Sequence, residues 1–412
     1  MLILKQPRIE SNIECSRLVC PVVISEQEGV QREETLWYEV ENEYASYLCR
    51  ERLDGALVSV LSYAMHNKHD IICEMPISER LYYQLVNFYI PIISREMPEW
   101  NHKIEITAQT ISERIENSNA VGTSVSGGVD SFYSIFENLN PIVKSVKLTH
   151  LLLLNAGGTG NSGDERPRIG FKEKLEFMKG YIEDVDLKFI KMDTNLNEFY
   201  NAGEEGCHYS GACRLMGCIL NLQKLFSVYH FPSGVTLKSF RFSPDPHYYD
   251  LFNLYCFSTE SLTVYSSGLQ FERDEKVEKI VGYSPTFKYL NVCNYHFNFN
   301  CSKCEKCVRT IMELEATGMI GQYREVFDLN MYYKNRWKLI GRYIGDREHK
   351  EFFKAIAPKL KNVGKDIPLL SYVYFYLICN PYNIARQKLR NVTLVRKIYE
   401  ALGGIKRFPR LY

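Results

Sequence analysis

The most telling stretch of this chain reads Ser126-Gly127-Gly128-Val129-Asp130-Ser131. It follows the short apolar run AVGTSV at 120–125 and leads directly into FYSIF at 132–136, which predicts a strand, a glycine turn and the start of a helix. Adjacent glycines permit positive φ angles, so successive N–H groups can point into one concavity. A helix that begins near Asp130 adds the positive end of its dipole. The stretch therefore predicts a loop that binds phosphate or pyrophosphate; the alternative is a plain tight turn.

The spacing differs from that of the P-loop of kinases and GTPases, which has four residues between its glycines and a Lys-Ser/Thr pair after the second. The run Ser-Gly-Gly-x-Asp-Ser instead resembles the signature of the PP-loop ATP pyrophosphatases, the adenine nucleotide alpha-hydrolase-like superfamily, which cleave ATP between its α and β phosphates. The resemblance implies catalytic functions for Ser126, Asp130 and Ser131. It further implies that the whole loop, with Gly127, Gly128 and Val129, binds ATP together with Mg²⁺, because departing pyrophosphate needs charge neutralisation.

A second motif lies far downstream, where four cysteines have the spacing C-x7-C-x2-C-x2-C: Cys293, Cys301, Cys304 and Cys307. Two-residue spacers suit a tetrahedral thiolate site, because a tight turn can aim both sulfurs at one ion. We expect structural Zn²⁺, with an iron–sulfur cluster as the alternative. His296 is an alternative ligand to Cys293. The chain has 13 cysteines and no recognisable secretory signal, which favours metal binding in a reducing, cytoplasmic location over disulfides.

The two motifs together resemble those of the 7-cyano-7-deazaguanine synthases, PP-loop enzymes that activate a carboxylate with ATP and convert it to a nitrile with ammonia. The first cysteine gap, of seven residues, is one residue shorter than in that family. The resemblance covers about residues 121–318, so the substrate is not carried over. It implies an ATP-dependent, C–N bond-forming ligase. Such an enzyme adenylates a small-molecule or protein carboxylate (or amide), releases pyrophosphate, and lets ammonia or an amine displace AMP.

Two other functions remain open from the sequence. One is a PP-loop sulfurtransferase that thiolates a small molecule or tRNA, for which a loose second group offers thiols: Cys207, His208, Cys213 and Cys218. The other is a non-catalytic, ATP-binding scaffold within a complex. The net charge of +1 provides no global field for nucleic acid or membrane. The basic run after Pro381 keeps RNA as a disfavoured alternative partner, and we expect a homo-oligomer.

The chain, at 412 residues, is long enough for more than one domain. We expect a mixed α/β N-terminal domain at 1–117, a PP-loop catalytic domain with the zinc site at 118–320, and a helical C-terminal region at 321–412. A hydrophobic fraction of 45% with 24% charged residues is ordinary for a globular protein. The most apolar run, 367–379, is too short to span a bilayer, so no membrane partner is expected.

The central region alternates between apolar strands and helices, which predicts an α/β fold with a parallel, doubly wound sheet. The resemblance makes this sheet Rossmann-like, of the HUP type. Strands are expected at 120–125, 150–155, 187–192 and 228–231, and helices at 131–138, 168–185 and 213–226. Ligands bind beyond the carboxyl ends of such strands. The PP-loop resemblance implies that backbone after the second strand contacts adenine, which nominates Leu154, Asn155 and Ala156.

The segment 231–250, beyond the fourth strand, offers candidates for catalysis. Adenylation builds negative charge on the α-phosphate, and a cation placed beside it stabilises the transition state. Lys238 and Arg241 are the candidates, with Arg273 and Lys276 in a later helix as competitors. Further polar candidates on the segment are Asp245, His247 and Asp250. The glycine-rich stretch 157–168 is either a mobile lid over the nucleotide or a solvated loop.

Overall fold

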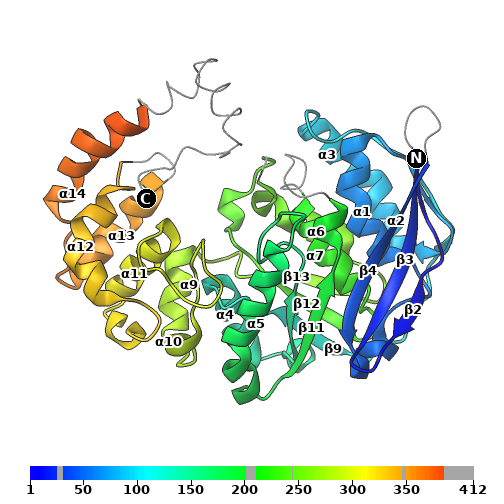
Figure 1. Ribbon diagram of the computed structural model, residues 1–412, viewed down its shortest axis with the longest axis horizontal. Helices are drawn as coiled ribbons and strands as arrows, with labels where there is room; N and C mark the ends of the chain where they lie inside the picture. Colours follow the sequence, from blue (N-terminus) through cyan, green and yellow to red (C-terminus); the bar gives the residue numbers. More distant parts are fainter. Residues whose placement is uncertain (26–30, 201–209, 244, 346–348, 385–412) are drawn as a thin grey trace. The chain divides into compact units, whose positions relative to one another are not determined.

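The computed structural model describes residues 1–25, 31–200, 210–243, 245–345 and 349–384. The chain divides into two compact units, Met1–Lys276 and Val277–Tyr412, drawn in one view in Figure 1. The first unit is α/β with a mostly parallel central sheet, and the second is helical. The division therefore falls elsewhere than the sequence suggests, because residues 1–117 belong to the same unit as the glycine loop.

Five parallel strands form the centre of the first unit's sheet, in the order β13–β12–β9–β10–β11. Their bounds are β9 Ala120–Ser124, β10 His150–Leu154, β11 Lys188–Thr194, β12 Phe226–Pro232 and β13 Thr263–Ser267. The four predicted strands are thus present, and β13 is a fifth. The chain adds β10 and β11 on one side of β9 and then β12 and β13 on its other side. The carboxyl ends of β9 and β12 therefore lie at the position where doubly wound sheets bind ligands.

The helices of this part are α4 Val129–Leu139, α5 Arg166–Asp184, α6 Leu196–Phe199, α7 Gly211–Leu220, α8 Asp250–Phe257 and α9 Arg273–Ile280. The expected helix at 213–226 is too long, since α7 ends at Leu220 and Phe226 already belongs to β12. The reason is tertiary: Phe226 pairs with Ala120 of β9. Its ring fills the space over Gly122, where a Cβ would lie 2.8 Å from the ring.

The N-terminal strands extend the same sheet rather than forming one of their own. The order continues from β11 through β4, β3, β1 and β5 to β7, with β2 paired to β3, and the blue strands in Figure 1 show this side. Their bounds are β1 Leu2–Leu4, β2 Arg8–Ser11, β3 Cys15–Ser25, β4 Gln31–Glu41, β5 Ile71–Cys73 and β7 Ile106–Thr107. The junction is antiparallel, with Tyr38 opposite Thr194 and Glu39 opposite Asp193. A separate pair joins β6 Ile77–Ser78 to β8 Thr110–Ile111.

Helices α1 (Asp54–Asn67), α2 (Glu79–Gln84) and α3 (Ile90–Glu96) complete the N-terminal part, with a π-helical turn between α2 and α3. Helix α1 packs unusually close to α7. A Cβ on Gly217 would lie 1.9 Å from Ser59 Oγ and 2.9 Å from the carbonyl oxygen of Gly55. The Ser59 hydroxyl is itself fixed by Tyr38, whose OH donates to it at 2.6 Å. The N-terminal part therefore contacts α7 of the same unit through close approach of the two helix backbones.

Gly217→Ala is therefore expected to destabilise the first unit, by about 1–3 kcal/mol, because overpacking forces the two helices apart. Chemical denaturation followed by tryptophan fluorescence measures the loss. Gly211→Ala is the matched control, since it lies in the same helix and a Cβ there meets nothing closer than 4.0 Å. Equal stability of the two variants would contradict the close α1–α7 packing.

The second unit consists of helices α10 Thr286–Tyr289, α11 Glu305–Ala316, α12 Leu329–Gly341, α13 Lys350–Asn362 and α14 Leu369–Tyr374, the last continued by a π-helical turn at Phe375–Cys379. They are the yellow to orange helices of Figure 1. The carboxylate of Glu315 is buried among them and accepts from Tyr332 Oη and Arg336 Nη2, each at 3.1 Å. Among the described residues, no helix of either unit is long and apolar enough to cross a membrane.

Candidate functional site

The loop between β9 and α4 lies at the centre of the candidate site. Gly127 has a φ of 75°, in the left-handed region that glycine tolerates best. The Ser126 N–H donates to Ser131 Oγ at 3.0 Å, and the Ser131 hydroxyl donates to the Ser124 carbonyl at 3.0 Å, so Ser131 closes the turn. Helix α4 begins directly afterwards without a side-chain cap. Its first N–H groups and dipole therefore offer an anion site at the carboxyl end of β9.

A buried lysine connects this loop with the end of β12. Lys276 Nζ lies 3.0 Å from Asp130 Oδ1 and also donates to the Ser233 carbonyl oxygen. The lysine side chain is 1% exposed and the aspartate 31%. The turn after β13 packs against the lysine stem, because a Cβ on Gly268 would lie 2.9 Å from Lys276 Cε. The arrangement holds a positive charge between the two loops that flank the crevice.

Lys238 and Arg241, the two cations favoured from the sequence, occupy different positions. Lys238 is exposed within a 3-10 helix at Leu237–Ser239. Arg241 is exposed as well, and its guanidinium stacks on Tyr248 with Cζ 3.4 Å from the ring centroid. Within the described part of the chain, no recorded contact joins either side chain to the glycine loop. The structure thus brings the competitor Lys276, and not these two, to Asp130.

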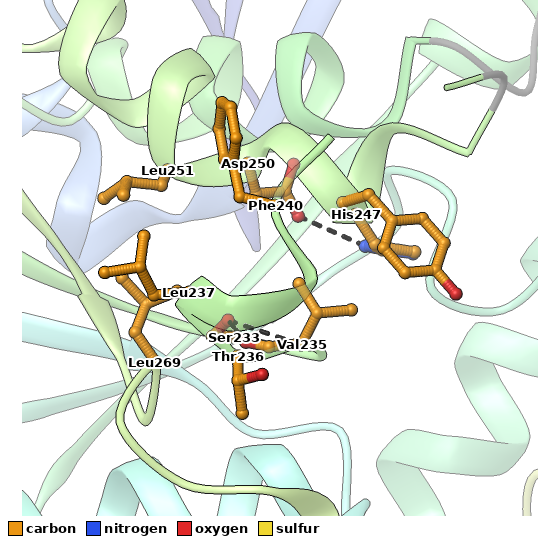
Figure 2. A pocket seen from close by; sticks show the side chains of 10 residues that line it. Ser233, Val235, Thr236, Leu237, Phe240, His247, Asp250, Leu251 and Leu269 are labelled. Carbon is orange, nitrogen blue, oxygen red and sulfur yellow. Dashed lines mark hydrogen bonds and ion pairs between the residues drawn. The ribbon is translucent and has the colours of Figure 1, made fainter. Parts of the chain in front are cut away.

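A small pocket opens beside Ser233, and Figure 2 shows its lining. His247 and Asp250 face each other on one side, with His247 Nδ1 and Asp250 Oδ2 3.2 Å apart. The opposite side is formed mainly by hydroxyl and apolar side chains: Ser233, Val235, Thr236, Leu237 and Leu269. Asp245 has a structural function, since its carboxylate accepts from the His247 N–H and caps a 3-10 helix. The pocket adjoins the lysine site at Ser233, whose carbonyl oxygen accepts from Lys276.

The carboxyl end of β10 carries the three residues expected at the adenine: Leu154, Asn155 and Ala156, all buried. The Asn155 side chain donates from Nδ2 to Asp193 Oδ1 at 2.7 Å. Its Oδ1 accepts a long hydrogen bond from Asn197 Nδ2 at 3.5 Å. Asn155 therefore anchors a polar network at the edge of the sheet.

Sequence reasoning missed the rest of this network. Arg168, at the start of α5, contacts both Asp193 and Glu198. Arg214 in α7 is buried and donates to Asn197 Oδ1 and, at 2.7 Å, to Asn161 Oδ1. For Asp193 a signal existed, because it comes directly after the strand predicted at 187–192, as Asn155 ends the one predicted at 150–155, and ligands bind at this edge of such sheets.

The thiols proposed for sulfur transfer are buried where the structure describes them. Burial raises the pKa of Cys213 to about 11 and raises that of Cys218 as well. Cys213 Sγ lies 3.5 Å from Tyr89 Oη. Cys207 and His208 lie outside the described residues. Cys213 and Cys218 are therefore neutral thiols near pH 7 and poor nucleophiles.

The second unit contains the cysteine cluster. The sulfurs of Cys293, Cys301, Cys304 and Cys307 all lie within 4.8 Å of one another, with Cys293 Sγ and Cys304 Sγ 4.0 Å apart. Hydrogen bonds from the other three thiols hold the pKa of Cys293 well below its ordinary value. Helix α11 begins right after Cys304, which places Cys307 in its first turn. Asn300 fixes the loop, because its Nδ2 donates to Leu290 O at 2.8 Å and Val326 O at 3.0 Å.

These sulfurs fit a four-coordinate metal such as zinc. Zn–S bonds of about 2.3 Å in a tetrahedron separate the sulfurs by about 3.8 Å, close to the observed spacing. His296 is not one of the clustered groups and instead stacks on Phe299 with ring centroids 4.0 Å apart. The described ligand set is therefore the four cysteines.

Two groups of candidate functional residues thus lie among the described residues. The first gathers loop, lysine and polar network at the carboxyl edge of the parallel sheet, and the second is a closed thiolate cluster in the helical unit. Comparison of the chain with protein-family models, with curated proteins and with solved structures gives no match.

Proposed function

We propose that the first unit binds ATP at the carboxyl edge of its parallel sheet and uses it to adenylate a carboxylate, in the manner of the PP-loop ATP pyrophosphatases. One observation carries the proposal: the left-handed Gly127 turn at the end of β9, followed by the uncapped start of α4. The strand order reverses at this strand, so the turn opens into the crevice. Backbone N–H groups in such a turn suit pyrophosphate and make no demand on a particular side chain.

The chemistry follows from the groups around that turn. A carboxylate oxygen of the substrate attacks the α-phosphorus, the bond from this phosphorus to the bridging oxygen breaks, and pyrophosphate leaves with the electron pair. Lys276 holds its charge between the two loops and stabilises the developing negative charge. When bound, Mg²⁺ neutralises the pyrophosphate, and the partly exposed Asp130 is the residue that would hold it. Leu154, Asn155 and Ala156 would border the adenine.

A nitrogen nucleophile completes the proposed reaction. Ammonia or an amine attacks the carbonyl carbon of the acyl-adenylate, AMP leaves, and the nitrogen gives up its proton to solvent. The described thiols favour this over sulfur transfer, because Cys213 and Cys218 are buried and protonated. Zinc on the cysteine cluster has only a structural function in this scheme, since all four of its positions are filled by protein thiolates.

Pyrophosphate and AMP release test the proposal. The full chain is incubated with ATP, Mg²⁺ and ammonium against a panel of carboxylic acids that includes 7-carboxy-7-deazaguanine. We expect release that depends on one acid and falls at least about 100-fold in Asp130→Ala. Glu137→Ala is the matched control, because it removes an exposed carboxylate from the same helix.

The other outcomes separate the remaining functions. ADP and phosphate as products would overturn the proposed bond cleavage. Tight ATP binding without pyrophosphate under every acid would favour the scaffold. Acid-dependent release that requires a sulfide donor in place of ammonium would favour the sulfurtransferase.

A further inference from the structure

Arg214 is a buried cation without a carboxylate partner among the described residues. The residue is 1% exposed. Its two recorded hydrogen bonds go to neutral amide oxygens, Asn197 Oδ1 and Asn161 Oδ1. Its Nε–H is buried and has no hydrogen-bond partner in the described part of the chain. Such a guanidinium lacks a carboxylate in direct contact with it among the described residues and also lacks one hydrogen bond, which is costly inside a protein.

The carboxylates in the neighbourhood are already engaged. Asp193 and Glu198 both contact Arg168, and Asp193 also accepts from Asn155. The Tyr200 ring, whose centroid lies 5.9 Å from Arg214 Cζ, provides only a weak cation–π contact. Among the described residues, Arg214 therefore has no carboxylate in direct contact, and a bound anion would give it both an ion pair and a partner for its Nε–H.

The surroundings of Arg214 also favour an anion. The residue lies in the first turns of α7, whose N-terminus has no side-chain cap hydrogen bond. The positive end of this helix dipole thus adds to the guanidinium charge. The loop after β10 covers the group closely, because a Cβ on Gly157 would lie 2.8 Å from Arg214 Nη2. Gly157 has a φ of 108° and Gly160 a φ of 119°, so the backbone of the loop over Arg214 takes conformations that favour glycine.

Asn161 is the part of the cover that touches the cation. Its amide oxygen accepts from Arg214 Nη2 at 2.7 Å. Asn161 is half-buried on the loop, whereas Arg214 is buried beneath that loop. An amide oxygen occupies the direction that one oxygen of a carboxylate or phosphate would take, but it carries no net charge. The amide oxygen of Asn161 therefore occupies the position on this guanidinium that an oxygen of a bound anion would take.

We propose that Arg214 receives an oxyanion of the ligand, and that Asn161 yields its place when residues 157–161 lift. A carboxylate or phosphate would accept from Nη2 and from the free Nε, in the two-bond geometry that guanidinium groups favour. The proposal deepens the proposed function and rests on it for the source of the anion, which is either the acid to be adenylated or a phosphate of the nucleotide. The glycine-rich stretch is then a lid that moves when the ligand binds, so that the anion replaces the Asn161 oxygen on Arg214.

Two substitutions on either side of one hydrogen bond test this. Dissociation constants of acetate, benzoate, inorganic phosphate and AMP are measured by calorimetry on the full chain at constant ionic strength. Arg214→Met is expected to weaken at least one of these anions by about tenfold or more, because the charge-assisted bonds are lost. Asn161→Ala is expected to tighten the same anion, on the order of fivefold, because the competing hydrogen bond is gone. Lys238→Met removes an exposed cation instead and should change nothing.

A purely structural function of the pair would weaken binding in both variants, and that result overturns the proposal. So does unchanged binding in Arg214→Met, or the absence of binding by all four anions. If Arg214→Met does not fold, Arg214→Lys keeps the charge without the two-bond geometry and should weaken the anion while Asn161→Ala still tightens it. Effects on acetate or benzoate identify the acid as the source, and effects on phosphate or AMP alone identify the nucleotide.

The same titrations keep this inference separate from the proposed function. ATP that binds and releases pyrophosphate without any Arg214-dependent anion leaves the function standing and removes the anion site. An Arg214-dependent anion in a chain that never cleaves ATP leaves the site standing and removes the adenylation.

Discussion

Cys304→Ser is expected to remove one equivalent of bound zinc from the purified protein and to destabilise the second unit. The four sulfurs lie within 4.8 Å of one another, so one ion would hold Cys293 to the segment with the other three cysteines, at the start of α11. Without the ion, this link between the two segments is lost. Zinc contributes about 10–16 kcal/mol to the folding of zinc-finger peptides. The loss here should be smaller, on the order of 5 kcal/mol, because the helices have buried contacts of their own, such as Glu315 with Arg336.

Metal content by mass spectrometry and thermal unfolding by circular dichroism measure this effect. Cys379→Ser is the matched control, because Cys379 is a buried thiol of the same unit outside the cluster. It should keep the zinc and most of the stability. Full zinc content in Cys304→Ser would contradict the four-thiolate site, and iron with visible absorption in the unaltered protein would replace zinc by an iron–sulfur cluster.

Lys276→Met is expected to lower the rate of acid-dependent pyrophosphate release by about 100- to 1,000-fold. Among the described residues, this lysine is the cation that contacts the glycine loop, and in the proposed reaction its charge stabilises the negative charge that develops on the α-phosphate. The substitution keeps an unbranched apolar stem in the space under Gly268. ATP affinity should fall much less than the rate, since the backbone N–H groups of the loop remain.

Lys238→Met and Arg241→Met are the matched comparisons, because they remove exposed cations from the segment after β12. Both should retain nearly the full rate of pyrophosphate release. A normal rate of pyrophosphate release in Lys276→Met, together with a lowered rate in either of the other two variants, would contradict this prediction. The cation that stabilises the transition state would then lie in the 231–250 segment. Unchanged thermal unfolding of each variant confirms that the comparison concerns catalysis and not folding.

The parts of the fold that the sequence predicted are those whose signals are local. The strand, glycine turn and helix around Gly127 lie within a few residues of each other, and the cysteine pairs are two residues apart, so pattern and geometry coincide. The end of α7 was wrong because the choice between helix and strand at Phe226 depends on pairing with β9, more than 100 residues away. Strand β13 was missed, since it is half exposed and its alternation is weak.

The choice of cation shows the same limit at the candidate site. Lys238, Arg241 and Lys276 look alike in sequence, and only the packing of α9 under the Gly268 turn carries one of them to Asp130. Arg214 gave no signal, because an arginine inside an apolar helix is identified as special only by its burial and by its partners in α6 and in the loop after β10. The covering Asn161 likewise meets it across 53 positions of chain.

The junction between β4 and β11 has a consequence for the order in which this chain can fold. Trp37 N–H donates to Asn195 Oδ1 across 158 positions, so during synthesis the β3–β4 hairpin leaves the ribosome long before its partner strand exists. An unpaired strand edge invites pairing with other chains. Strand β4 is rich in charge, with Arg32, Glu33, Glu34, Glu39 and Glu41 along its 11 residues, and such side chains discourage that pairing. The charged side chains of β4 thus protect the nascent chain from pairing with other chains until β11 has been synthesised.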